Sequence, residues 1–141
     1  MKPKLLLRIA AVMMLMHAIG HTMGHMGWRK TNDPVKLEVI RQMTEPKFPF
    51  MGVVRSMGEY FEGFSNSATI LLLLAFSLLW ILSNISVNHP LVAANLLWPI
   101  SIALLLLGID ELIYFFPFAA PFSIIASLLS FFVFLKLRKT V

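Results

Sequence analysis

The sequence predicts an all-α polytopic membrane protein, a four-transmembrane-helix bundle with a short helical extracytoplasmic cap. The composition is the first reason, because the 141 residues are 58% hydrophobic and only 13% charged, unlike most water-soluble domains. Four apolar runs also approach the ~20 residues that a helix needs to cross the hydrocarbon layer. Finally, both ends of the chain are basic, as expected when an even number of crossings returns the chain to its starting side.

The four predicted spans are separated by turns and by one longer segment. The first run is followed by Trp28, an interfacial residue type, and the second begins near Ser67. Pro90 precedes the third run, and Pro117 and Pro121 mark the turn before the fourth. We therefore expect spans at about residues 5–26, 67–84, 91–109 and 119–135, within a single membrane domain over residues 1–141.

The longer segment, residues 28–66, is predicted to form the helical cap. Asp33 and Pro34 are typical of a helix N-terminus, and the following charges alternate with apolar residues in an amphipathic pattern that ends before Pro46. The stretch from Phe50 to Phe64 is predicted to form a second short helix at the membrane surface. Charges of both signs nearly balance across this segment, which is typical of an exported loop.

Basic side chains at the two ends of the chain set the expected orientation. Cytoplasmic flanks of membrane helices carry an excess of Lys and Arg, so both termini are expected in the cytoplasm and the cap outside the cytoplasmic (inner) membrane. The net charge of +5 then reflects topology, and no nucleic-acid partner is expected. The chain has no cysteine, which excludes disulfides and thiolate catalysis. The basic residues at the ends are Lys2, Lys4, Arg8, Lys136, Arg138 and Lys139.

Three histidines in the first span are the clearest candidates for a site. His17, His21 and His25 are spaced four apart and therefore form one stripe on the helix, which Gly20 and Gly24 share or flank. Two histidines at this spacing can chelate a divalent metal, and ionisable residues in a span usually face the protein interior. A metal site, a proton-transfer or substrate-binding site, and plain helix packing at the glycines all remain open.

A second candidate group precedes the second span. Arg55, Glu59 and Glu62 fall at i, i+4 and i+7, which places a cation and two carboxylates on one face of the predicted helix. If that face meets the histidines, its carboxylates could complete a metal shell, orient an imidazole, or act as acid and base. The alternative is a solvated helix face with an ordinary ion pair.

Asp110-Glu111, near the outer end of the third span, is a third acidic feature. Its predicted depth matches that of His21 and His25, so Asp110 is a candidate for the same cavity. A carboxylate inside hydrocarbon costs on the order of 2.5–3.5 kcal/mol, and it should therefore find a partner such as Arg55 or a histidine. The alternative is placement at the interface, in contact with water.

Some of these residues form a pattern seen elsewhere. His17-x-x-Gly20-His21 in the first span occurs with Met51-Gly52-x-x-Arg55-Ser56 and Tyr60-x-x-Gly63-Phe64 before the second. The combination resembles an uncharacterised family of small bacterial four-helix integral membrane proteins. The resemblance implies the same order of spans and a role for His17, His21, Arg55 and Glu59 as a set. The architecture and the residue types are also similar to those of four-helix membrane isomerases, and this similarity is an analogy only.

These observations lead to one functional hypothesis and one alternative. The hypothesis is a ligand-binding site near the extracytoplasmic face that binds a lipophilic or anionic small molecule or a metal, with the question of enzymatic activity open. The alternative is a non-catalytic membrane subunit or assembly protein whose glycine/histidine stripe is a packing face. Expected partners are the lipid bilayer, a lipophilic small molecule and a second copy of the chain. The site candidates are His17, His21, His25, Arg55, Glu59, Glu62 and Asp110; His21, Glu59 and Asp110 are the catalytic candidates, and the three histidines the metal ligands.

Overall fold

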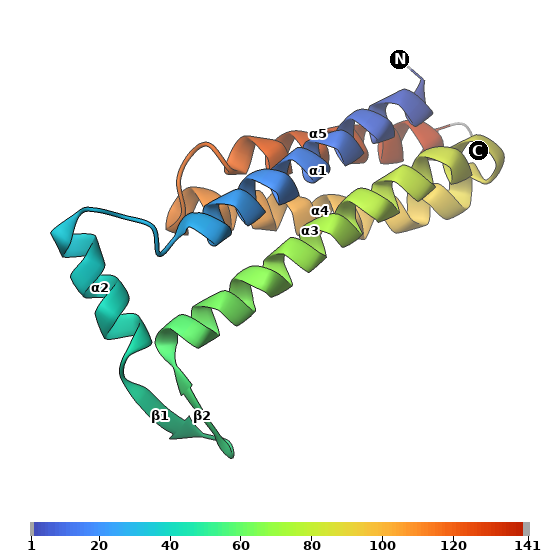
Figure 1. The fold of residues 1–141 in the computed structure, drawn as a ribbon. Helices are drawn as coiled ribbons and strands as arrows, with labels where there is room; N and C mark the ends of the chain where they lie inside the picture. Colours follow the sequence, from blue (N-terminus) through green and yellow to red (C-terminus); the bar gives the residue numbers. More distant parts are fainter. Residues whose placement is uncertain (1, 140–141) are drawn as a thin grey trace. The chain divides into compact units, whose positions relative to one another are not determined.

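The computed structural model describes residues 2–139, and helix accounts for 81% of the chain, which confirms the predominantly helical class. Two short strands lie between the second and third helices (Figure 1). Four of the helices are long and apolar enough to cross a membrane, α1, α3, α4 and α5. The elements are α1 (Pro3–Gly27), α2 (Pro34–Thr44), β1 (Lys47–Phe50), β2 (Val53–Ser56), α3 (Met57–Asn88), α4 (Pro90–Tyr114) and α5 (Ala120–Arg138).

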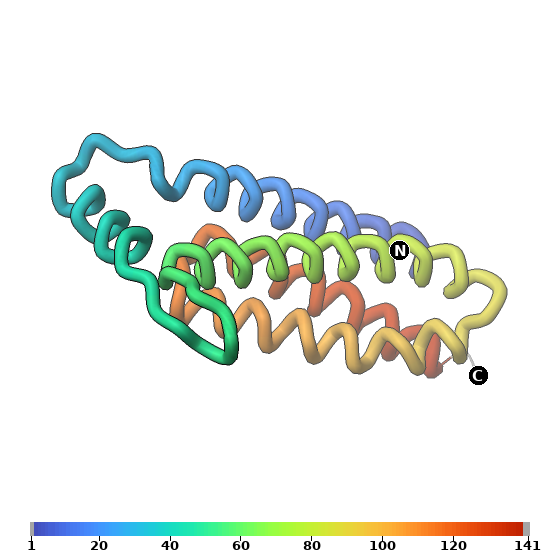
Figure 2. The backbone as a smooth tube through the Cα atoms, turned by 60° about the horizontal axis from the view of Figure 1, so that its bottom comes forward, coloured from blue at the N-terminus to red at the C-terminus, as the bar shows by residue number. Residues whose placement is uncertain are grey.

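The described residues pack as two compact units. Unit 1 comprises the chain up to Ala18 and from Leu72 onward, and unit 2 comprises Ile19–Leu71. In unit 1, α4 and α5 run antiparallel and are joined by a short turn (Figure 2). Their contact is close at Gly108, where an added Cβ would lie 2.5 Å from Cγ1 of Ile124. The close approach explains why glycine occupies this position.

The core of unit 1 follows a spacing of alternately three and four residues. This period keeps one stripe of each helix turned toward its neighbours, as in coiled coils. Leucine and alanine fill most of the buried positions, but each of three helices also places polar side chains there. On α1 the stripe contains Leu7, Ala10, Met14 and His17; on α4 it contains Ala94, Leu97, Ser101, Leu104, Gly108 and Glu111; on α5 it contains Ala120, Ser123, Ser127 and Ser130.

The amphipathic helix predicted after Asp33 is confirmed as α2. Asp33 caps it by accepting a hydrogen bond from the Val35 N–H at 2.9 Å, and Pro34 occupies the first turn. Arg41 and Gln42 donate hydrogen bonds to Glu38, and these bonds, Arg41 first, lower the pKa of this carboxyl to about 2. The Glu38 carboxylate on the exposed side of α2 therefore stays ionised at any physiological pH.

The second cap helix, predicted from Phe50 to Phe64, is wrong in its first half. Residues 47–56 form the antiparallel β1–β2 hairpin, in which Phe48 pairs with Arg55 and Phe50 with Val53. Met51 and Gly52 make the turn with φ of 48° and 85°, the left-handed conformations that a tight two-residue hairpin turn requires. Phenylalanine and valine suit strands, and the Met-Gly pair is a turn that the helical interpretation overlooked.

Helix α3 begins where the hairpin ends, well before Ser67. The Ser56 hydroxyl accepts a hydrogen bond from the Glu59 N–H at 3.2 Å, and the Glu59 carboxylate accepts one from the Ser56 N–H at 2.7 Å. This reciprocal arrangement is a capping box, for which Ser-x-x-Glu is the sequence signature. Arg55 therefore lies on β2, so the predicted helical face shared by Arg55, Glu59 and Glu62 is wrong for Arg55.

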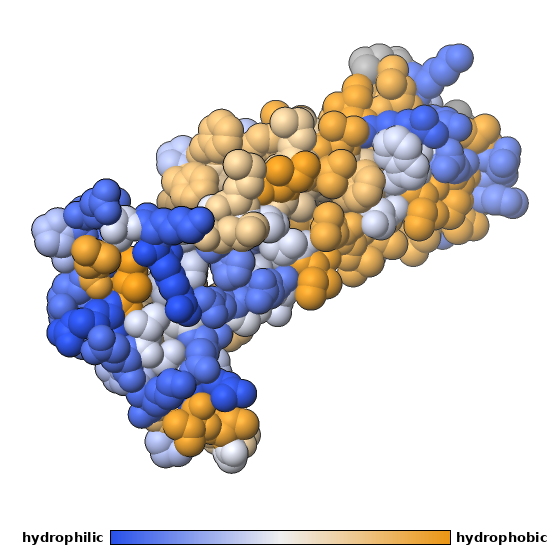
Figure 3. Space-filling model, viewed as in Figure 1, coloured by the Kyte–Doolittle hydropathy of each residue, from blue (hydrophilic) through white to orange (hydrophobic). Residues whose placement is uncertain are grey.

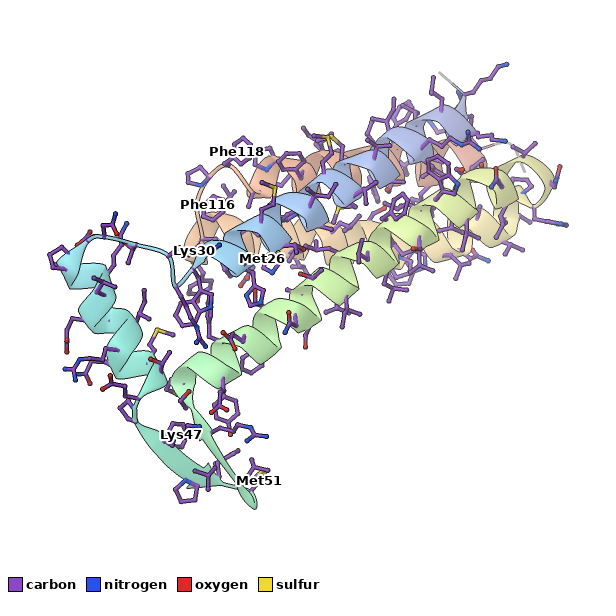
Figure 4. All side chains as sticks on the ribbon, in the orientation of Figure 1. Met26, Lys30, Lys47, Met51, Phe116 and Phe118 are labelled. Atoms are coloured by element: carbon purple, nitrogen blue, oxygen red, sulfur yellow. The ribbon has the colours of Figure 1, made fainter. Side chains whose placement is uncertain are left out.

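The surface reflects this division of the elements. Figure 3 shows apolar side chains over the long helices, polar side chains gathered on α2, and a separate apolar patch on the hairpin. Met51, at the tip of the hairpin (Figure 4), is 89% exposed. Phe116 and Phe118, in the turn between α4 and α5, are also exposed (Figure 4).

Candidate functional site

Three polar side chains meet in the core of unit 1. His17 on α1, Glu111 on α4 and Ser123 on α5 are at most 7% exposed, and each occupies a buried position of its helix. The Ser123 hydroxyl donates a hydrogen bond to Oε1 of Glu111 at 3.2 Å and lies 3.2 Å from Nδ1 of His17. Nε2 of His17 lies 3.4 Å from the same Oε1. We refer to these three residues as the buried polar cluster.

The hydrogen bonds of the buried polar cluster constrain its protons. The Ser123 hydroxyl has one proton, which it donates in a hydrogen bond to Oε1 of Glu111. With that proton engaged, the hydroxyl oxygen can only accept from His17, which corresponds to the tautomer with a proton on Nδ1. Nε2 of His17 faces Oε1 of Glu111, and a proton between these two atoms would satisfy both of them.

One atom of the cluster has no partner among the described residues. Oε2 of Glu111 is buried without a hydrogen bond, although buried polar atoms are almost always paired. The Glu111 carboxyl group could carry a proton on Oε2, or Oε2 could accept a hydrogen bond from a ligand. The cluster therefore combines a close contact of an imidazole with a carboxyl group and an unsatisfied acceptor, an arrangement that is also found in acid–base sites.

A second set of polar contacts lies in unit 2, between the last turns of α1 and the first turns of α3. Nε2 of His21 donates a hydrogen bond to the Ser65 carbonyl oxygen at 3.0 Å. Further along, the hydroxyl groups of Thr22 and Thr69 lie 3.3 Å apart. Arg29 forms an ion pair with Glu62 at 2.6 Å. Together with the edge contact of the Trp28 and Phe61 rings, whose centroids lie 5.0 Å apart, these polar contacts join the two helix ends.

The predicted site residues thus divide between several places. Of the three histidines, His17 joins the buried polar cluster, His21 bonds to the α3 backbone, and His25 has a buried Nδ1 that finds no hydrogen-bond partner within residues 2–139. Glu59 closes the capping box and lies 3.9 Å from Nζ of Lys47. Glu62 pairs with Arg29, a partner that the spacing did not suggest.

The acidic pair in α4 is split by the helix. Successive helical residues point about 100° apart, so only one of the two can face the core, and the structure buries Glu111 and exposes Asp110. Glu111, and not Asp110, continues the buried stripe of α4 that contains Leu97, Ser101 and Leu104, so this spacing favours burial of Glu111. Ser123 has the weaker signal of a serine on the apolar α5.

The arrangement of donors bears on the metal hypothesis. Residues 2–139 contain no group of three or more His, Asp or Glu side chains placed to hold a metal ion. Nε2 of His21 donates to a carbonyl oxygen and so lacks the lone pair that a ligand needs. In this arrangement Nε2 of His21 is therefore not free to bind a metal.

Comparison with known proteins adds no family to this description. The chain matches no protein-family model, none of the curated proteins and none of the solved structures with which it was compared. Its function is therefore argued from its own residues.

Proposed function

We propose that the chain is a multi-pass membrane protein whose buried polar cluster binds a proton and exchanges it with a lipophilic molecule dissolved in the bilayer. The observation that carries this proposal is the environment of Glu111. Its carboxyl group is buried, contacts His17 and Ser123 through one oxygen and leaves the other oxygen without a partner. Ionisable groups within a membrane span are costly and usually serve function.

Each residue of the cluster has a chemical role in this proposal. His17 and Glu111 share the exchangeable proton, so that one serves as acid when the other serves as base. Ser123 is a positioning residue, because its hydroxyl fixes the imidazole by accepting from Nδ1 and fixes the carboxyl group by donating to Oε1. Oε2 of Glu111 is the atom at which a substrate would receive or deliver the proton.

Aromatic side chains beside the cluster favour a lipophilic substrate. The Phe122 ring lies 5.9 Å from the His17 ring, and the Phe118 ring lies 5.7 Å from that of Phe122. Phe118 is 74% exposed in the turn after α4. A hydrophobic molecule approaching from the bilayer would meet these rings before it reached His17, and ligand sites are commonly walled by aromatic side chains.

The orientation of the chain completes the proposal. Basic side chains flank the start of α1 and the end of α5, which favours a position of both termini in the cytoplasm. Glu111 lies within the last turn of α4, which ends at Tyr114. In this orientation the buried polar cluster is near the extracytoplasmic face of the cytoplasmic membrane.

The second candidate function is that of a non-catalytic membrane subunit in which the cluster only joins helices. A specific contact favours it, since the Ser127 hydroxyl on α5 donates to the Ser101 carbonyl oxygen on α4 at 2.7 Å. Serine hydroxyls therefore serve packing elsewhere in the same interface, as they do in many membrane helices.

Infrared spectroscopy of the protein in lipid bilayers distinguishes the two functions. We expect a pH titration to show the carbonyl band of one protonated, buried carboxyl group appearing as the pH falls, together with a change in an imidazole band. Glu111→Gln should abolish both changes, whereas the exposed neighbour Asp110→Asn is the matched control and should retain them. A titration that is the same in wild type and Glu111→Gln would contradict proton exchange and leave the packing role.

A further inference from the structure

Unit 2 contains an open groove of about 340 Å³ between the hairpin and the first turns of α3. Strand β2 forms one wall, and Tyr60 in the lining stacks on Phe48 of β1 with ring centroids 6.0 Å apart. The groove belongs to neither the buried polar cluster nor the contacts of His21. Its lining residues are Val53, Arg55, Glu59, Tyr60, Gly63, Phe64 and Ser67.

The charges of the groove favour an anion. Arg55 presents a guanidinium group, of which Nη1 donates to the Val54 carbonyl oxygen at 3.1 Å, and its planar fork has further N–H donors that match a phosphate. The one carboxylate in the lining, Glu59, accepts the Ser56 N–H and lies 3.9 Å from Nζ of Lys47. The charges of both Lys47 and Arg55 act on this carboxylate, so the three groups together retain an excess of one positive charge.

The rest of the lining is mainly apolar, and α3 carries exposed apolar residues beyond it. Phe64 is 75% exposed and Val53 is 44% exposed, while Gly63 leaves the floor between them without a side chain. Tyr60, Gly63, Phe64 and Ser67 share a face of α3 with Leu71, which is 62% exposed. The groove therefore leads from Arg55 on β2 to this apolar face of α3, a helix apolar enough to cross a membrane.

We propose that the groove binds one anionic phospholipid, with the lipid phosphate against Arg55 and an acyl chain along Phe64 and Leu71. The order of chemical groups from Arg55 on β2 to Phe64 and Leu71 on α3 matches that of a phospholipid from headgroup to tail. A guanidinium at the boundary between water and hydrocarbon attracts anionic headgroups. The missing side chain at Gly63 leaves space for the first methylene groups of the acyl chain.

Native mass spectrometry of the detergent-solubilised full chain tests this proposal with phosphatidylglycerol and phosphatidylcholine of identical acyl chains. Wild type should retain one phosphatidylglycerol more tightly than phosphatidylcholine. Arg55→Gln should weaken phosphatidylglycerol binding about tenfold, as loss of a charge-assisted contact implies, and should remove the preference. Gly63→Leu should weaken binding of both lipids. Its Cβ would meet no protein atom within 4 Å, so the protein tolerates the leucine, whose side chain then occupies space in the groove that Gly63 lines.

Matched controls separate the groove from general effects of charge and size. Lys36→Gln removes a positive charge from the exposed surface of α2, and Gly24→Leu adds a leucine where a Cβ also meets nothing within 4 Å. Both should bind phosphatidylglycerol like wild type. Inorganic phosphate should not displace the lipid, since it lacks an acyl chain. Wild-type binding by Arg55→Gln and Gly63→Leu, equal binding of the two lipids, or full displacement by phosphate would each overturn the proposal.

Discussion

Replacing His17 by alanine is expected to lower the free energy of unfolding by about 3–5 kcal/mol. The substitution removes one partner of a buried pair and leaves Glu111 in the core with the Ser123 hydroxyl as its remaining contact in the buried polar cluster. A buried carboxyl group without its partner must bear the cost of desolvation or hold a proton permanently. Reversible unfolding in mixed detergent micelles measures the loss.

The double-mutant cycle with Glu111→Gln tests whether the loss arises from this pair. Residues in direct contact usually show a coupling energy of about 0.5–3 kcal/mol, so His17→Ala should cost less when the charge of Glu111 has already been removed. Asp110→Asn, on the exposed side of α4, provides the control and should change the unfolding free energy by less than about 0.5 kcal/mol. Additive effects of His17→Ala and Glu111→Gln would contradict the proposed pair.

Replacing Gly108 by valine is the second substitution with a large expected effect. Even the Cβ would lie 2.5 Å from Cγ1 and 3.3 Å from the backbone N of Ile124. A new rotamer of Ile124 relieves only the first contact, so α4 and α5 must move apart. We expect a loss of about 1–3 kcal/mol in the same unfolding measurement, the range found for overpacked cores.

The substitution should also disturb the buried polar cluster, since Glu111 follows Gly108 by one turn and Ser123 adjoins Ile124. The infrared change assigned to Glu111 should therefore weaken in Gly108→Val. Gly20→Ala is the matched control, because its Cβ meets nothing within 4 Å, and it should be at least as stable as wild type. A stable Gly108→Val variant would show that the α4–α5 contact is looser than described.

The long helices could be predicted from the sequence because length and hydropathy alone determine whether a helix can cross a bilayer. The helix α2 was equally accessible, since Asp33-Pro34 is a local signal that needs no tertiary partner. The hairpin was missed, because most residues from Phe50 to Phe64 are acceptable in a helix as well as in a strand. Two local signals in this stretch do favour the observed structure: the Met51-Gly52 turn and the Ser56-x-x-Glu59 capping box at the start of α3.

The candidate site was predictable only in part. The stripe of histidines identified His17, but helical spacing along α1 carries no information about which residues of α4 and α5 face it. The choice of Glu111 over Asp110 depends on the rotation of α4, which the spacing of its buried residues sets. Ser123 could be recognised only once α5 was placed beside α4, because contacts between distant segments are properties of the packed fold.

The two units distribute polar groups in different ways, and this difference bears on function. In unit 1 the side chains of the buried polar cluster are shielded from solvent. In unit 2 the polar contacts, such as the ion pair of Arg29 with Glu62, are partly exposed, and exposed pairs contribute little to stability. We therefore expect substitutions in unit 1 to affect folding and proton binding together, and substitutions in the groove of unit 2 to affect lipid binding alone.

Four crossings with both ends in the cytoplasm, as proposed, would place the buried polar cluster inside the bilayer, and cysteine labelling tests this arrangement most directly. The chain has no cysteine, so each single-cysteine variant reports one position. In intact cells, a membrane-impermeant maleimide should label Met51→Cys at the hairpin tip but not Lys2→Cys or His89→Cys in the turn before α4. Both unlabelled variants should react once the membrane is permeabilised. Labelling of Met51→Cys and His89→Cys from the same side would contradict four crossings, and with them a proton site within the membrane.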